Sequence, residues 1–128
     1  MEIIEGQVVK GLGVGKKLGF ETINILYDGK LSGVFAGKVF VGEKPKEGFL
    51  SAVHIGKRPT VNENVPILEA HIIDGFEKFS KKDFVGEKIK VEIFEKIRDT
   101  KKFENLDELK KQIAKDVVDV GYFFKRNT

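Results

Sequence analysis

Six short apolar stretches, separated by glycine, proline, asparagine or aspartate, dominate the first three quarters of this chain. Stretches of this length between turn-forming residues are typical of β-strands. In the last of them Ile89, Val91 and Ile93 alternate with Lys90 and Glu92, as expected for a strand with one buried face. The predicted strands cover residues 3–9, 22–26, 33–41, 49–55, 67–73 and 88–97.

One segment near the end has a helical period instead. Its apolar residues recur every three or four positions and form a single stripe. They are Leu106, Leu109, Ile113, Val117 and Val120. Asn105 and Glu108 have the spacing of an N-terminal capping pair, and Gly121 is suited to end the helix. A helix over about 105–121 is therefore predicted.

Strands that do not alternate with helices argue against a Rossmann or P-loop architecture. The 128 residues suit one domain, predicted to span 1–128. Six strands with short connections and one late helix predict a mainly β protein. Its expected form is a small closed antiparallel barrel over about 1–100 with a C-terminal α-helix packed against it.

Composition narrows the class of protein further. Hydrophobic residues make up 41% and charged residues 34%, which is typical of a folded globular chain. No apolar run has the length of a membrane span and no signal-peptide pattern opens the chain, so we expect a cytoplasmic protein with no membrane partner. The net charge of +3 is spread over mixed Lys and Glu, so no nucleic-acid partner is expected.

The loop KGLGVGKKLGF, residues 10–20, is rich in glycine and lysine. It fails the Walker pattern, because Lys10 occupies the position of the first glycine and Lys17 that of Ser/Thr. It also fails the dinucleotide pattern G-x-G-x-x-G. Glycine amides and mobile lysines nevertheless suit an anion such as phosphate. A solvated surface hairpin is the alternative, and composition alone favours it.

The predicted strand over 67–73 contains Leu68-Glu-Ala-His-Ile72. Alternation puts Glu69 and His71 on one face and the apolar residues on the other. A carboxylate in this position can act as a general base if it reaches a substrate hydroxyl. Without other information a solvent-facing polar pair is the favoured interpretation, and His54, a lone histidine in an apolar strand, is interpreted as a core or rim residue.

Several short motifs, in order along nearly the whole chain, resemble those of the riboflavin kinase (flavokinase) family. The family occurs alone in eukaryotes and as the C-terminal domain of bacterial bifunctional FAD synthetases. Each motif alone is short, but the ordered set is specific and favours the functional interpretation of both the loop and the strand. The matching segments are GQVVKG (6–11), KLGF (17–20), ETINI (21–25), GVFA (33–36), IGKRPT (55–60), LEAHI (68–72) and IRDTKKF (97–103).

The resemblance implies a six-stranded Greek-key barrel with a C-terminal helix. It also implies a riboflavin kinase, which transfers the γ-phosphoryl of ATP to the 5′-hydroxyl of riboflavin with Mg²⁺ and gives FMN and ADP. The substrates would be the small molecules riboflavin and ATP, and a monomer is expected. The residues themselves do not distinguish ATP from CTP as the donor.

The resemblance also implies roles for particular residues, matched by position. Glu69 would accept the hydroxyl proton, and Thr22 and Asn24 would bind Mg²⁺ and the nucleotide phosphates. On a strand these two side chains point to the same face. The phosphate flap would consist of Gly15, Lys16, Lys17 and Gly19, and the flavin would be bordered by Arg98, Phe103 and Leu106.

The chain departs from the family pattern at Glu21, where the family has proline. Proline would stiffen the start of this strand, and glutamate adds negative charge near Asn24. The change leaves Thr22 and Asn24 in place. We therefore expect it to affect the reaction rate or the geometry of the metal site and not the family assignment. The sequence contains no adenylyltransferase module, so the expected product is FMN and not FAD unless the chain is a domain of a longer protein.

Two other functions compete with a kinase. A flavin- or nucleotide-binding module without turnover would bind riboflavin but form no FMN. A β-barrel that binds single-stranded nucleic acid would need exposed stacking aromatics and a cationic groove. The chain has no Trp and two Tyr, and most Phe residues lie in apolar strands or at the end of the helix, so this second alternative is disfavoured.

Overall fold

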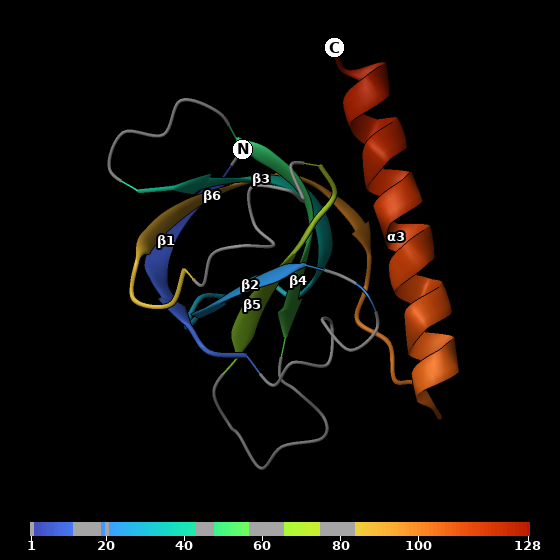
Figure 1. Cartoon of the computed structure of the whole chain (residues 1–128). Coiled ribbons are helices and arrows are strands. Elements are labelled where there is room, and N and C mark those ends of the chain that lie inside the picture. Colours follow the sequence, from blue (N-terminus) through green and yellow to red (C-terminus); the bar gives the residue numbers. More distant parts are fainter. Residues whose placement is uncertain (1, 12–18, 20, 43–47, 57–65, 75–83) are drawn as a thin grey trace.

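The computed structural model describes residues 2–11, 19, 21–42, 48–56, 66–74 and 84–128. Within this part of the chain six antiparallel strands close into a barrel in the order β1-β2-β5-β4-β3-β6, with one helix, α3, beside it (Figure 1). The barrel prediction is therefore confirmed. The strands are β1 (Glu2–Val9), β2 (Thr22–Leu26), β3 (Gly33–Val41), β4 (Phe49–Gly56), β5 (Ile67–Ile72) and β6 (Lys88–Arg98).

Alternation along the strands separates an apolar interior from an outer wall. On β5, Leu68, Ala70 and Ile72 are buried in the barrel core, while Glu69 and His71 point outward between them. The interior is filled by aliphatic side chains from all six strands, which removes their surface from water and provides the main stabilisation. The core includes Val8, Ile23, Ile25, Phe35, Val39, Val53, Ile55, Ile89, Val91 and Ile93.

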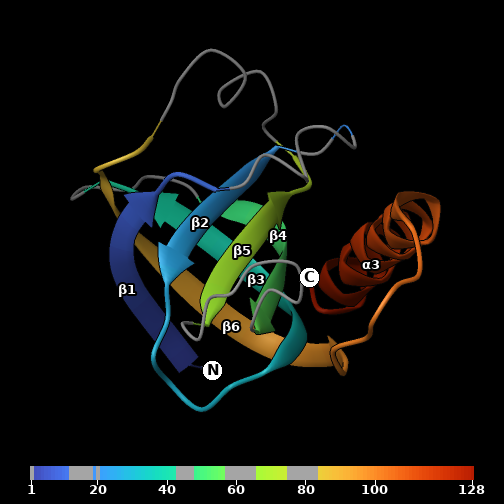
Figure 2. The same ribbon diagram turned by 90° about the horizontal axis from the view of Figure 1, so that it is seen from below.

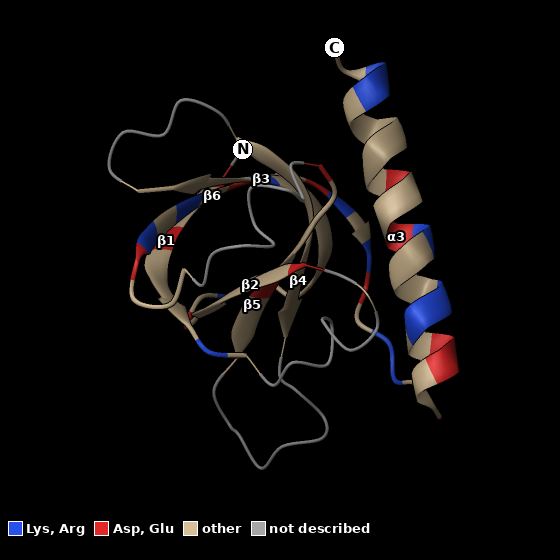
Figure 3. Ribbon diagram, viewed as in Figure 1, with Lys and Arg blue, Asp and Glu red and all other residues tan. Residues whose placement is uncertain are grey.

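Helix α3 (Leu106–Arg126) packs on the outer wall of β3, β4 and β6, as the view from below shows (Figure 2). Val120 and Phe124 contact Ala36 and Ala52, whose small side chains let the helix come close to the sheet. Basic and acidic residues are interspersed along the helix (Figure 3). Within the described residues, no helix has both the length and the apolar character that crossing a bilayer requires.

The predicted start of the helix is confirmed and the predicted end is wrong. The Asn105 side chain accepts a hydrogen bond from the Glu108 backbone N–H at 2.9 Å, as an N-cap does. The helix then passes through Gly121 and ends at Arg126. The physical reason is that Phe124 is buried against the barrel wall, and this packing outweighs the low helix propensity of one glycine.

Candidate functional site

The pairing of β2 with β5 builds the centre of the site. In this antiparallel pair Asn24 lies directly opposite Glu69, and Thr22 lies opposite His71. Ile23 and Ile25 point into the core, so Thr22 and Asn24 share the outer face, as alternation predicted. The two strands lie far apart in the sequence, and their register brings a hydroxyl, an amide and a carboxylate together on one surface.

Glu69 and His71 form a close hydrogen-bonded pair. His71 Nε2 and Glu69 Oε1 are 2.6 Å apart, and the side chains are 6% and 22% exposed, respectively. An ionised carboxylate only accepts hydrogen bonds, so beside ionised Glu69 the Nε2 atom of His71 carries the proton. A carboxylate has about four acceptor positions, so one bond to His71 orients it while leaving it able to accept others.

Asn24 is buried and lies close to Gly11. Its side chain is buried, with 5% of its surface exposed. A Cβ atom added to Gly11 would lie 2.4 Å from Asn24 Nδ2, which is closer than carbon and nitrogen can approach. Residue 11 must therefore be glycine for Asn24 to keep this orientation.

The Glu21 departure does not disturb the strand pairing. The Glu21 carbonyl accepts a hydrogen bond from the Ile72 N–H at 2.9 Å, which continues the β2–β5 ladder past Thr22. The residue that replaces the family's proline is thus fixed through its backbone.

Two aligned rows of outward-facing residues cross the barrel wall here. In the first, which we call the site row, Asn24, Glu69, His54, Val34 and Arg98 are successive register partners on β2, β5, β4, β3 and β6. In the second row His71 is followed by Ala52 and Ala36, which α3 covers. The site row therefore lies next to the row that α3 covers, and it reaches from Asn24 to Arg98.

Arg98 at the end of the site row binds α3. Its Nε and Nη2 atoms each donate to a carboxylate oxygen of Asp116 at 2.7 Å, and Gln112 Nε2 donates to the same carboxylate at 2.9 Å. The Asp116 side chain is only 4% exposed. The register between β3 and β6 is irregular near Val34 and Ala36, in the same part of the wall. Sequence reasoning missed the pair, although a charged residue between Ile113 and Val120 in the apolar stripe was a visible signal.

The other residues expected at the flavin lie near the start of α3. Phe103 is half-buried, with Lys101 Nζ 5.8 Å from its ring centroid. Leu106, the first residue of the helix, has 56% of its surface exposed and does not contribute to the buried stripe. The structure thus leaves an apolar side chain accessible beside the helix N-terminus.

The expected phosphate flap is described only at one position. Gly19 has φ +92°, a conformation that favours glycine. Gly15, Lys16 and Lys17 lie outside the described residues.

The residues around Asn24 fit a magnesium ion that is also bound by phosphates. Magnesium prefers hard oxygen ligands, keeps several waters and needs only one or two ligands from the protein. The Thr22 hydroxyl and the Asn24 amide oxygen have this chemistry and share one face. Among the described residues no group of three or more His, Cys, Asp or Glu could hold a metal by itself. The donor set therefore fits a metal that arrives with a nucleotide.

The electrostatics of His54 differ from those of a surface histidine. Desolvation by burial lowers the pKa of His54 below its ordinary value, Glu69 opposes this, and His71 and Arg98 reinforce it. The imidazole is therefore neutral at physiological pH.

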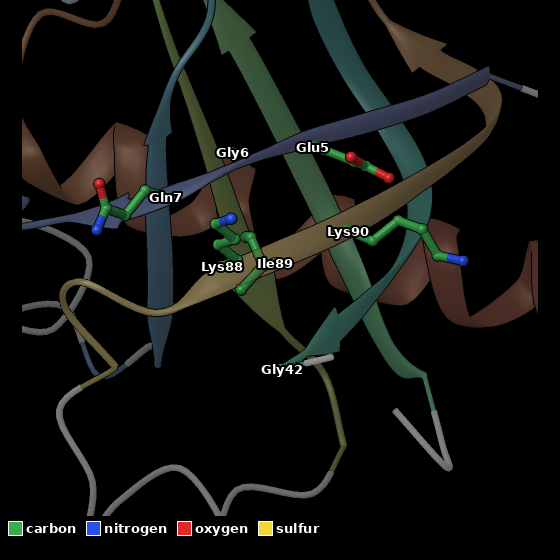
Figure 4. A pocket seen from close by; sticks show the side chains of 7 residues that line it. All are labelled: Glu5, Gly6, Gln7, Gly42, Lys88, Ile89 and Lys90. Carbon is green, nitrogen blue, oxygen red and sulfur yellow. The ribbon is translucent and has the colours of Figure 1, made fainter. Parts of the chain in front are cut away.

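A separate open cavity of about 530 Å³ lies on the wall formed by β1 and β6 (Figure 4). Glu5, Gln7, Lys88 and Lys90 line it together with Gly42. Glu5 and Lys90 in this lining are cross-strand neighbours of opposite sign, and Lys88 lies opposite Gln7. The lining includes none of the site-row residues. We therefore place the candidate site on the β2–β5–β4 wall.

The outer wall of a small closed barrel thus brings a hydroxyl, an amide and an oriented carboxylate together. The chain belongs to the riboflavin kinase family, since the family model described as "Flavokinase: Riboflavin kinase" matches residues 2–124. The family resemblance noted in the sequence is thereby confirmed.

Individual relatives agree with this family. The chain is 39% identical over 127 residues to the RNA-binding riboflavin kinase RibR of Bacillus subtilis, covering 98% of this chain and 52% of that protein. It is 39% identical over 124 residues to the bifunctional riboflavin kinase/FMN adenylyltransferase of Haemophilus influenzae, covering 94% and 38%, respectively. The chain thus spans about half or less of these relatives.

A solved structure shares the fold. The crystal structure of riboflavin kinase from Trypanosoma brucei superposes with a TM-score of 0.64 at 23% identity, covering 96% of this chain and 76% of that one. At this identity the comparison supports the barrel-and-helix architecture alone.

Proposed function

We propose that this chain is a riboflavin kinase that transfers the γ-phosphoryl group of ATP to the 5′-hydroxyl of riboflavin, forming FMN and ADP. The observation that carries the proposal is the position of Glu69, opposite Asn24 on β2 and hydrogen-bonded to His71. A carboxylate so placed can take a hydroxyl proton next to a site suited to phosphate and metal. Membership of the riboflavin kinase family supports riboflavin as the acceptor.

In the proposed reaction Glu69 is the general base. Its carboxylate accepts the proton of the 5′-hydroxyl while the hydroxyl oxygen forms a bond to the γ-phosphorus. The bond between that phosphorus and the oxygen bridging to the β-phosphate breaks, and ADP leaves with the bonding electrons. The proton then passes from Glu69 to solvent. A positioned base of this kind contributes about 10²–10⁴-fold to the rate.

His71 acts through Glu69 as a positioning residue. Its Nε2–H group holds Oε1 at 2.6 Å and so limits the carboxylate to a narrow range of orientations. His71 itself is buried, which fixes its ring against the wall. Alignment matters because transfer requires attacking and leaving oxygens to be roughly in line.

Thr22 and Asn24 would hold Mg²⁺, and the ion would neutralise charge on the nucleotide phosphates. Glycine at residue 11 leaves room for the Asn24 amide in this orientation. The proposed flap of Gly15, Lys16, Lys17 and Gly19 would cover the phosphates and exclude water.

Arg98, Phe103 and Leu106 are proposed to border the flavin. Arg98 donates from Nε and Nη2 to Asp116 and from Nη1 to the Asp99 carbonyl. At the flavin edge it would therefore offer a fixed guanidinium plane and the N–H groups that remain. Leu106, the first residue of α3, offers an exposed apolar side chain.

The test is to incubate the pure protein with riboflavin, Mg²⁺ and each nucleoside triphosphate in turn, and to separate FMN from riboflavin by chromatography. We expect FMN with ATP. FMN formed with CTP alone would change the donor but keep the reaction. Riboflavin binding without FMN from any nucleotide would instead establish a flavin-binding module without turnover.

A further inference from the structure

We propose that His54 binds the ribityl chain of the acceptor, beside Glu69 on the barrel wall. This inference rests on the proposed function and deepens it, because it assigns a residue to the polyol part of the substrate. His54 is a register partner of Glu69 on β4, one strand nearer to α3. Adjacent strands are about 4.8 Å apart, so a chain whose terminal hydroxyl reaches Glu69 passes His54 on its way to the helix.

The ring of His54 points out of the barrel. Its neighbours Val53 and Ile55 are fully buried in the core, so His54 lies on the opposite face. Every buried side-chain nitrogen and oxygen among the described residues has a hydrogen-bond partner. No hydrogen bond to the His54 ring is found within that part of the chain, so its nitrogens reach the surface where a ligand can meet them.

The chemistry of the site row complements a polyol. A hydroxyl both donates and accepts hydrogen bonds. Ionised Glu69 only accepts, and Arg98 only donates. A neutral imidazole has one donor and one acceptor, and it lies between these two residues in the row. His54 can therefore donate to one hydroxyl of the polyol and accept from the next, whereas Glu69 can only accept and Arg98 can only donate.

The neutral state of His54 is consistent with its surroundings on every packed element. Burial disfavours the charged ring most strongly. Glu69 and His71 face it from β5, Arg98 from β6 and Asp116 from α3, and the two acids are partly offset by Arg98 and His71. An imidazole of this kind donates and accepts at the pH where the kinase would work.

The test compares two flavins and three variants by quenching of flavin fluorescence, without nucleotide. Riboflavin carries the ribityl chain, and lumiflavin has a methyl group in its place. His54→Phe keeps the ring size and removes both hydrogen-bonding groups, His54→Gln keeps a donor and an acceptor, and Lys88→Gln on the β1–β6 wall is the control. Thermal unfolding checks that each variant is folded.

We expect His54→Phe to weaken riboflavin binding about tenfold or more, because a lost hydrogen bond leaves its partner unsatisfied. Lumiflavin binding should change by less than about twofold, and His54→Gln should recover most of the riboflavin affinity. In the kinase assay the KM for riboflavin should rise more than kcat falls.

Equal losses for riboflavin and lumiflavin, or no loss for riboflavin, would overturn the inference while leaving the proposed function intact. Failure of His54→Gln to recover affinity in a folded protein would also overturn it. A wild-type protein that binds neither flavin would reject the proposed function itself, and the inference with it.

Discussion

Two carboxylates on this molecule, Glu69 and Asp116, lie near the two ends of the site row, and their surroundings differ. The Asp116 side chain is 4% exposed and accepts two hydrogen bonds from Arg98 and one from Gln112. The Glu69 side chain is 22% exposed and is oriented at one oxygen by His71. A buried carboxylate bound by an arginine and a glutamine stabilises the structure, whereas one that is oriented and partly exposed can accept a proton. The environment, and not the residue type, separates the two tasks.

Replacing Glu69 should produce the largest effect on catalysis. Glu69→Gln keeps the shape of the side chain and removes the base, so we expect kcat for FMN formation to fall by about 10²–10⁴-fold. Riboflavin binding should change little, and the free energy of unfolding should change by less than about 1 kcal/mol because the side chain is partly exposed. Chromatographic rate measurement and flavin fluorescence together check this. Retention of full kcat would remove Glu69 from the mechanism.

Replacing Asp116 should reduce stability, whereas replacing Glu69 should reduce kcat. Asp116→Ala leaves the Arg98 guanidinium without its partner, and we expect the free energy of unfolding to fall by about 3 kcal/mol. Urea denaturation measures this. The double variant Arg98→Met with Asp116→Leu should recover most of the stability, since apolar residues of similar size often replace a buried ion pair without loss. A loss below about 1 kcal/mol in Asp116→Ala would contradict the structural role.

Gly11→Ala tests whether the Glu69 end depends on the orientation of Asn24. The new Cβ would approach Asn24 Nδ2 to 2.4 Å and force the amide to turn. We expect kcat to fall about tenfold or more and the Mg²⁺ concentration required for half-maximal rate to rise, because small displacements in an active site are costly. Rates measured over a Mg²⁺ titration provide the readout. An unchanged Mg²⁺ requirement would show that Asn24 does not hold the metal.

Gly121→Ala should strengthen the helix without touching either carboxylate. The position is helical and an added Cβ meets no atom within 4 Å. Alanine should therefore raise the free energy of unfolding by about 0.5–1 kcal/mol and leave kcat unchanged. Thermal unfolding and the kinase assay provide the two readings. A drop in kcat would mean that the two ends of the site row are coupled through the helix.

The smallest expected effect is the change in the free energy of unfolding with pH. Burial lowers the pKa of His54 below the ordinary value of 6.5, so as the pH falls through that value the unfolded chain binds a proton that the folded chain does not. Stability should therefore fall on acidification, and His54→Gln should lose less stability than wild type between about pH 7 and pH 5. Urea unfolding at both pH values gives the comparison. Equal losses in both proteins would show that burial does not perturb His54.

Much of the barrel could be predicted because strand period and turn residues are local signals. All six strands were placed to within about a residue or two at each end, and Glu69 and His71 were placed on one face by alternation alone. The pairing of Asn24 with Glu69 was not predictable from local patterns, because β2 pairs with β5 across two intervening strands of sequence. Register between distant strands depends on the whole barrel closing.

The helix shows where local signals mislead. Gly121 has the character of a helix stop, yet packing of Phe124 against the wall continues the helix to Arg126. Leu106 fits the apolar period but lies at the helix start with its side chain exposed. Asp116 breaks the period and is buried nonetheless, because Arg98 arrives from a different element. For Gly121 and Asp116 a tertiary contact overrides the local preference of the residue, whereas Leu106 is exposed because it lies at the first position of the helix.

The alternation along β5 has an evolutionary consequence. Leu68, Ala70 and Ile72 pack in the barrel core, while Glu69 and His71 lie on the outer face of the same short strand. Because adjacent residues of β5 are selected for different properties, stability and function, mutations that change substrate preference need not destabilise the fold. A scaffold of this kind is a favourable starting point for engineering new acceptors, provided that the changes are confined to every second residue.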